Sequence, residues 1–118
     1  MQEGKRQRQV AGIIQESMSD IFLRLSLNML NGGMVSISSV KITPDLLEAR
    51  IYLSFYKIQD EKSALKKIEA RSREIKKELT QRVNHQLRRM PVISYFIDDT
   101  LEHAFKMEEL FKQISNKQ

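Results

Sequence analysis

The segment GMVSISSVKITPDLLEARIYLS (residues 33–54) has the pattern of two β-strands joined by a tight turn. Ala49 to Tyr56 alternates apolar and polar residues, which is typical of a strand with one buried face. Residues 34–42 also alternate, but the apolar positions change parity near Ser38-Ser39, so we expect a bulge there. Thr43-Pro44-Asp45 predicts the turn, because proline fixes φ and removes a backbone donor. The segment therefore predicts a twisted β-hairpin.

Helical periodicity appears on both sides of this hairpin. Residues 5 to about 28 have apolar groups at helical spacing, and Asn31-Gly32-Gly33 is expected to stop that helix. After the hairpin, Asp60 is a candidate N-cap for a long helix that runs to Arg89 and ends before Pro91. Ser72 interrupts the apolar stripe of this second helix.

The remaining sequence predicts one more strand and one more helix. Val92 to Ile97 is short, apolar and aromatic, as in a strand with both faces covered. Asp98-Asp99-Thr100 offers N-caps for a last helix that reaches Ile114. The expected order is helix-strand-strand-helix-strand-helix, an α+β fold with the helices packed on a three-stranded sheet. With 118 residues and no long linker, residues 1–118 are expected to form a single domain.

Composition excludes several classes of protein. The chain has no cysteine, which excludes disulfides, thiolate zinc sites and cysteine nucleophiles. Its start is basic but has no uninterrupted apolar region, so we expect no secretory signal. No apolar run approaches the roughly 18 residues of a membrane span. We therefore expect a soluble, cytoplasmic protein.

Positive charge is concentrated in the second helical segment. The chain has a net charge of +5, and residues 60–91 hold ten Lys and Arg against five Asp and Glu. On a straight helix one flank would carry Lys66, Arg73, Lys77 and Arg88, and the other Arg71, Arg82 and Arg89. Lys5, Arg6 and Arg8 form a second cluster. Such stripes attract polyanions, but an ordinary solvated face with pairs such as Glu74–Lys77 and Glu78–Arg82 explains them equally well.

The other candidate sites favour structural interpretations. Tyr52 and Tyr56 could stack on bases, but beneath packed helices they would be core residues, which we favour. Asp98-Asp99 is better explained by helix capping than by a metal. His85 and His103 have no nucleophile arrangement, and Gly32-Gly33 is too short for a phosphate cradle. The amphipathic first helix is expected to cover the sheet rather than lie on a membrane. We expect no enzymatic activity, cofactor or metal.

Three ordered motifs resemble the bacterial ribosome-binding factor A family. Residues 33–54 are similar to its strand, Ser/Thr-Pro-Asp-Leu turn and second strand ending in Tyr-x-Ser. Lys5-Arg6 with Arg8-Gln9-Val10 resembles the opening of the family. Arg88-Arg89-Met90-Pro91 and Tyr95-Phe96-Ile97-Asp98-Asp99-Thr100 resemble its Arg-x-x-Pro and Phe-x-x-Asp-x-Ser segments. The resemblance covers nearly the whole chain.

The resemblance implies a KH-like domain of the second type. It also implies a non-enzymatic role in late maturation of the small ribosomal subunit, including 16S rRNA processing. Family members lack the Gly-x-x-Gly loop of ordinary KH domains, and no Gly follows Gly33 here. They break the long helix at an Ala-x-Gly kink, for which Ala70-Arg71-Ser72 is the nearest equivalent, with Ser in place of Gly. We predict a bend between Ala70 and Lys76; the alternative is a straight helix in which Ser72 allows close approach to the sheet.

The expected function is binding to the small ribosomal subunit and its rRNA by a protein that is monomeric when free. Two alternatives remain: a general KH-type single-stranded nucleic-acid binder and a basic module that binds an acidic protein. The residues expected to contact phosphates are Lys5, Arg6, Arg8, Arg71, Arg73, Lys76, Lys77, Arg82, Arg88 and Arg89.

Overall fold

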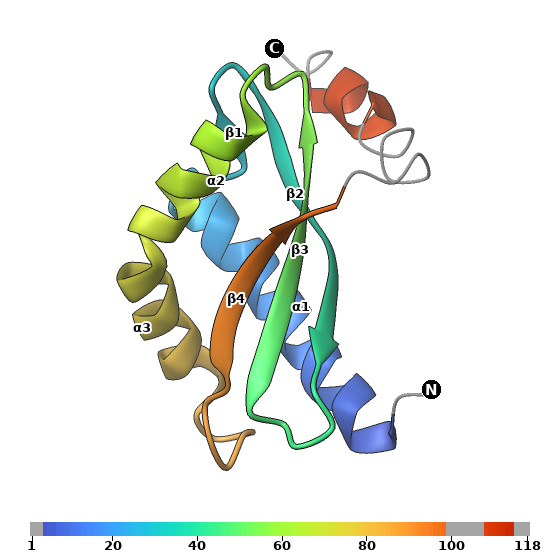
Figure 1. Cartoon of the computed structure of the whole chain (residues 1–118), viewed down its shortest axis with the longest axis vertical. Helices are drawn as coiled ribbons and strands as arrows, with labels where there is room; N and C mark the ends of the chain where they lie inside the picture. The colour runs from blue at the N-terminus through green and yellow to red at the C-terminus, as the bar shows by residue number, and fades with distance from the viewer. Residues whose placement is uncertain (1–3, 99–107, 115–118) are drawn as a thin grey trace.

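The computed structural model describes residues 4–98 and 108–114. Its elements in chain order are α1 (Lys5–Arg24), β1 (Met29–Leu30), β2 (Gly33–Ile42), β3 (Glu48–Tyr56), α2 (Glu61–Ala70), α3 (Ser72–Val83) and β4 (Val92–Ile97) (Figure 1). Residues 108–114 are helical as well. The chain has an α+β fold in which α1 lies behind the sheet and α2 and α3 run along its β4 side.

The sheet has four strands in the order β1-β2-β3-β4, so the expectation of three strands is wrong. β1 pairs antiparallel with β2 across Asn31 and Gly32, whose φ angles are 52° and 81°. Two central residues with positive φ form the tight turn that suits a hairpin, and Asn-Gly is its preferred sequence. The same residues that were expected only to stop a helix therefore create a short edge strand.

The first helix ends earlier than expected, at Arg24 rather than near residue 28. Ser26 has a φ of 59°, and the Leu27 N–H donates to the Phe22 carbonyl at 2.8 Å. This arrangement closes the last turn and satisfies carbonyls that a helix end leaves unpaired. Because the helix ends here, Met29 and Leu30 can pair with β2 as strand β1.

The bulge expected in β2 is confirmed. Ile37 pairs with Leu53 and Ser39 pairs with Tyr52, which leaves Ser38 as the extra residue. Ser38 Oγ lies 2.8 Å from Asp98 Oδ2 and 3.0 Å from the Tyr52 carbonyl oxygen. Asp98 thus contacts the bulge, whereas Asp99, Thr100 and the start of the expected last helix lie outside the described residues.

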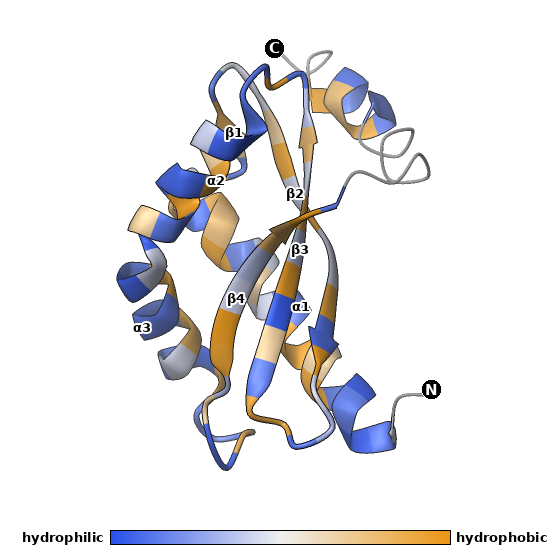
Figure 2. Ribbon diagram, in the orientation of Figure 1, coloured by the Kyte–Doolittle hydropathy of each residue, from blue (hydrophilic) through white to orange (hydrophobic). Residues whose placement is uncertain are grey.

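One face of the sheet shares the hydrophobic core with α1, α2 and α3. Fully buried side chains include Ile14, Met18 and Ile21 of α1, Ile51 and Leu53 of β3, and Ile68, Ile75, Leu79 and Val83 of α2 and α3. Figure 2 shows that hydrophobic and hydrophilic residues alternate along the ribbons of α1, α2 and α3, as expected of helices with one buried side. β4 does not have both faces covered, because Val92 and Phe96 are exposed.

The expected single helix over residues 60–89 is two helices. Asp60 caps α2 by accepting a hydrogen bond from the Ser63 N–H, as expected. Arg71 separates α2 from α3 with φ −102° and ψ 15°, within the segment where we expected a bend. Ser72 is exposed, so the alternative of a straight helix with Ser72 against the sheet is wrong. Helix α3 then ends at Val83, and residues 84–91 form an irregular connection to β4.

Candidate nucleic-acid interface

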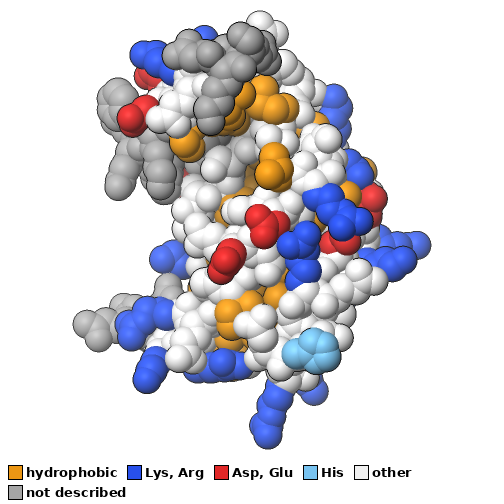
Figure 3. Space-filling view, turned by 180° about the vertical axis from the view of Figure 1, so that it is seen from behind, with side chains coloured by type: hydrophobic (Ala, Val, Ile, Leu, Met, Phe, Trp, Pro, Cys, Tyr) orange, Lys and Arg blue, Asp and Glu red, His pale blue; other side chains and the backbone are white. Residues whose placement is uncertain are grey.

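The N-terminal cations and the 84–91 connection meet at one end of the molecule. Arg6 Nη2 donates a hydrogen bond to the Gln86 carbonyl at 3.1 Å, across 80 positions of sequence. We call this region the basic end and define it by Lys5, Arg6, Arg8, Arg88 and Arg89, all of which are exposed. In Figure 3, Lys and Arg side chains project from the lower part of the molecule, where this end lies. Two clusters that are distant in sequence therefore form one positively charged surface.

The basic end surrounds a hollow of about 260 Å³. Arg6, Arg88 and Arg89 line it together with the apolar side chains of Val10, Leu87 and Pro91. Asp45, Leu46 and Leu47 of the β2–β3 turn complete the lining. A concave apolar surface bordered by guanidinium groups is suited to an anionic ligand with an apolar part.

The position of Arg88 differs from the one that a straight helix predicted. Helix α3 ends at Val83, and the Gln86 and Leu87 N–H groups both donate back to the Val83 carbonyl, at 2.9 and 3.1 Å. The chain then leaves the helical path. Arg88 and Arg89 consequently line the same hollow as Arg6. Arg88 does not extend the flank of Arg73 and Lys77, and Arg89 does not extend that of Arg71 and Arg82.

Three further predicted cations remain on the outer surface of α3. Arg73, Lys76 and Lys77 are exposed, and within the described part of the chain none of their side chains forms a hydrogen bond or ion pair. We call these three residues the α3 cations. They remain available to an anionic partner.

Arg71 and Arg82 are used differently, because both contact neighbouring protein groups. Arg71 Nη1 donates to the Leu25 carbonyl at 2.9 Å, and Arg71 Nη2 lies 2.6 Å from Glu74 Oε1. Leu25 is the C-cap of α1, where a cation satisfies an unpaired carbonyl and opposes the negative end of the helix dipole. Arg71 therefore joins the α2–α3 break to the end of α1.

Ion pairs also connect α1 with α3. Arg82 Nη1 lies 3.5 Å from Asp20 Oδ2, and Arg24 Nε lies 2.9 Å from Glu78 Oε1. We call Arg24, Arg71 and Arg82 the seam arginines. The expected pairs Glu74–Lys77 and Glu78–Arg82 are wrong. Glu74 pairs instead with Arg71, three positions earlier, and Glu78 pairs with Arg24 of the adjacent helix α1.

The two tyrosines of β3 do not belong to the buried core, contrary to expectation. Tyr52 is half-buried on the sheet face opposite α1, α2 and α3 and stacks on Phe96, with 5.4 Å between ring centroids and 27° between ring planes. Tyr56 packs edge-on against Phe111 at 5.3 Å. The strand alternation placed both correctly on one face, but it could not show that α1, α2 and α3 all cover the other.

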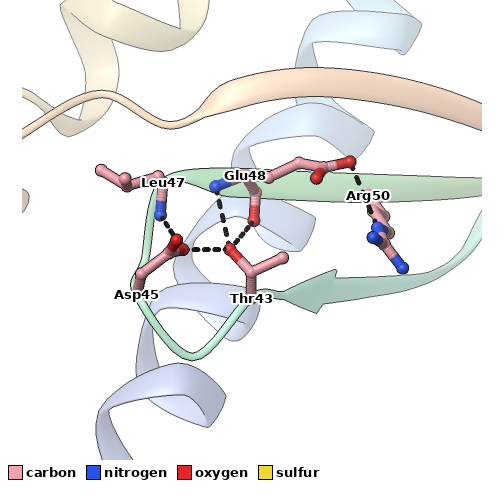
Figure 4. Close-up of polar contacts among 5 residues, drawn as sticks. All are labelled: Thr43, Asp45, Leu47, Glu48 and Arg50. Carbon is pink, nitrogen blue, oxygen red and sulfur yellow. Dashed lines mark hydrogen bonds and ion pairs between the residues drawn. The ribbon is translucent and has the colours of Figure 1, made fainter.

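The β2–β3 turn forms an ordered wall of the basic end (Figure 4). Asp45 Oδ1 accepts hydrogen bonds from the Thr43 hydroxyl at 2.7 Å and the Leu47 N–H at 3.0 Å, and both bonds lower the pKa of Asp45. Nearby, Glu48 Oε1 accepts from Arg50 Nε at 3.2 Å, which raises the pKa of Arg50. The Thr43-Pro44-Asp45 signal thus predicted the turn, but not its contribution to the basic end.

Other candidate sites contribute little to this surface. Among the described residues there is no group of His, Asp and Glu side chains arranged to hold a metal ion. His85 is exposed, and His103 lies outside the described residues. In the same described ranges, no helix is long and apolar enough to cross a membrane.

The sequence and the fold are both similar to known proteins. The model of the family described as Ribosome-binding factor A matches residues 6–111. Ribosome-binding factor A of Christiangramia forsetii is 34% identical over 95% of this chain and 86% of its own length. The corresponding protein of Cytophaga hutchinsonii is 34% identical over 96% of this chain and 85% of its own length.

A solved structure has a similar fold. The crystal structure of ribosome-binding factor A from Thermus thermophilus superposes with a TM-score of 0.64 at 16% identity, and covers 77% of this chain and 94% of its own. The similarity to this structure supports the fold alone. The family is shown by the family model and by the relatives of higher sequence identity. The chain belongs to the ribosome-binding factor A family.

Proposed function

We propose that this protein binds the small ribosomal subunit through its rRNA during late maturation, at the stage of 16S rRNA processing. The observation that carries the proposal is the joining of Arg6 to the Arg88-Arg89 segment at one end of the fold. The names of its relatives, which describe ribosome-binding factors, support a ribosomal partner. In this proposal the protein acts in the cytoplasm by binding alone, as a monomer and without a cofactor.

The proposed contact surface consists of the basic end and the α3 cations. Their guanidinium and ammonium groups would contact RNA phosphates and release condensed counterions, which favours binding at low salt. We assign the seam arginines to helix packing, because their contacts with carboxylates and with the Leu25 carbonyl lie at the junctions between α1, α2 and α3. The residues that we propose to contact RNA phosphates are therefore fewer than the sequence predicted: Lys5, Arg6, Arg8, Arg73, Lys76, Lys77, Arg88 and Arg89.

Binding of this kind can favour one arrangement of the rRNA over another. A ligand shifts a conformational equilibrium only by its differential affinity for the two states. The basic end and the α3 cations lie on different parts of the molecule, so RNA that reaches both must have a compatible shape. We therefore propose that the protein stabilises one local arrangement of immature rRNA.

The expected KH-like character belongs to the same proposal. The order of β2, β3, the α2–α3 pair and β4 supports a KH-like domain of the second type. The absence of glycine after Gly33 argues against the phosphate-clamping loop of a general KH-type binder of single strands. A basic module that binds an acidic protein is the remaining alternative.

Sedimentation of the tagged protein with ribosomal particles tests the proposal. We expect the protein to migrate with small subunits, to be released by added salt, and to be lost from the particle after nuclease treatment. Cells that lack the protein should accumulate 16S rRNA precursors. Continued association with ribosomal proteins after complete RNA digestion would instead favour the protein-interaction module.

A further inference from the structure

The hollow of the basic end is lined by two chemically different sets of side chains. Arg6, Arg88 and Arg89 are exposed cations, whereas Val10, Leu87 and Pro91 are apolar and at least half-buried. Phosphate contact alone needs cations but no apolar cavity. The apolar lining therefore indicates that part of the ligand enters the hollow.

The size of the hollow limits what can enter. Its volume of about 260 Å³ lies below the range of about 300–1,000 Å³ that is usual for drug-sized ligands. A paired RNA helix cannot enter such a space, but a single unpaired base can, since unpaired bases are the part of RNA that proteins can surround. The guanidinium groups at the border would then contact the phosphates on either side of that base.

The β2–β3 turn adds a fixed hydrogen-bond acceptor to this cavity. Both hydrogen bonds to Asp45 end on Oδ1, which leaves the lone pairs of Oδ2 for a donor on a ligand. The exocyclic amino group of adenine or cytosine is such a donor. The Leu47 side chain also lines the hollow and is 44% exposed, so it is accessible to a base.

We propose that the hollow between Arg6, the Asp45–Leu47 turn and the Arg88-Arg89 segment binds one unpaired nucleotide of RNA, with its base against the apolar lining. This inference rests on the proposed function and adds a defined subsite to it. The subsite is preorganised, because the Arg6–Gln86 hydrogen bond holds two of its walls together and Asp45 fixes the third.

The test uses two RNA hairpins with the same stem and one bulged position. The first hairpin has an adenosine at the bulge, and the second has an abasic site that keeps both phosphates but lacks the base. We expect the wild-type protein to bind the adenosine hairpin about tenfold more tightly, a difference of about 1.4 kcal/mol. Leu47→Asn should remove most of this preference without changing affinity for the abasic hairpin.

Leu23→Asn is the matched control, because Leu23 is 65% exposed near the opposite end of α1. This variant should keep the wild-type preference for adenosine. Equal binding of the two hairpins by the wild type, or binding of neither, would overturn the subsite. Loss of particle binding in Leu47→Asn without any preference between the hairpins would also overturn it, and would indicate an apolar group of a ribosomal protein in the hollow.

Sedimentation of the wild-type protein with small subunits separates this failure from failure of the proposed function. If the protein still migrates with the particle in a nuclease-sensitive manner, the proposed function stands and only the nucleotide subsite is wrong. If it does not migrate with the particle, the proposed function itself is wrong.

Discussion

Arginines at the basic end and arginines at the seam between α1 and α3 carry the same chemical group but make different contacts. Arg71 and Arg82 contact the Leu25 carbonyl, Glu74 and Asp20. Arg88 and Arg89 have no hydrogen bond or ion pair among the described residues, and they border an apolar hollow. Arginines from one segment of the sequence can therefore either join helices or border a binding surface. Only the groups that each side chain contacts show which of the two it does.

The largest expected effect follows from reversing charge at the basic end. Arg88→Glu with Arg89→Glu should weaken binding to small subunits about 100-fold at low salt, because two phosphate contacts are lost and repulsion is added. The measurement is the affinity for purified small subunits at fixed salt. Lys62→Glu with Lys66→Glu makes the same charge change on exposed positions of α2 and should have a much smaller effect. Equal losses in the two variants would mean that net charge alone determines binding.

Changing a seam arginine should affect folding instead. Arg71→Gln removes a charged donor from the C-cap carbonyl of α1 and the partner of Glu74. Hydrogen bonds that involve a charged group contribute up to about 1.5–3 kcal/mol, and partial exposure reduces this, so we expect a loss of about 1–2 kcal/mol in the free energy of unfolding. Urea denaturation measures it. Wild-type stability in this variant would show that the contact at the helix break is dispensable.

The sequence predicts those features of the fold that depend on contacts between neighbouring residues, and it misses features that depend on contacts between distant segments. Local signals were sufficient for the Ser38 bulge, the Asp60 cap and the Thr43-Pro44-Asp45 turn, since each depends on neighbouring residues. Asn31-Gly32 was a strong hairpin signal, but the apolar residues before it favoured a longer helix. The edge strand was missed for that reason.

The candidate site was less predictable than the fold, because its contacts join distant segments. The positions of Arg88 and Arg89 follow from where α3 ends, and helix ends are hard to place from a pattern alone. The hydrogen bond from Arg6 to Gln86 depends on the packing of α1 against the rest of the fold. Nothing local distinguishes Arg82, which reaches Asp20 of α1, from the neighbouring α3 cations.

Arg82 offers a smaller test of the same comparison. Its contact with Asp20 is a solvent-exposed ion pair with a distance of 3.5 Å, and such pairs contribute about 0–1 kcal/mol. Arg82→Gln should therefore lower the free energy of unfolding by less than Arg71→Gln does. Its affinity for small subunits should remain close to that of the wild type. A loss of affinity as large as that of the Arg88-Arg89 variant would show that Arg82 belongs to the surface that binds RNA.

The smallest expected effect is a change in how much folding stability is lost at low pH. The pKa of Asp45 lies below its ordinary value of 3.8 because Thr43 and Leu47 donate to the carboxylate. A lowered pKa contributes stability that is present above the unfolded value and is lost as the pH falls through the folded value. Between about pH 5 and about pH 2, Asp45→Asn should therefore lose less stability than the wild type. Urea midpoints across this pH range measure the difference. Parallel plots of midpoint against pH for the two proteins would show that Asp45 does not contribute to the loss of stability in acid.

In the proposed function, the basic end binds RNA while the seam arginines maintain the fold. The most direct test compares Arg88→Gln/Arg89→Gln with Arg71→Gln, by measuring the slope of log affinity for small subunits against log salt in each. We predict that the Arg88-Arg89 variant reduces the slope by about 1.4–1.8, since each RNA phosphate contact contributes about 0.7–0.9, with unchanged stability. Arg71→Gln should keep the wild-type slope and lose stability. An equal decrease of slope in both variants, or a decrease in Arg71→Gln alone, would contradict the account.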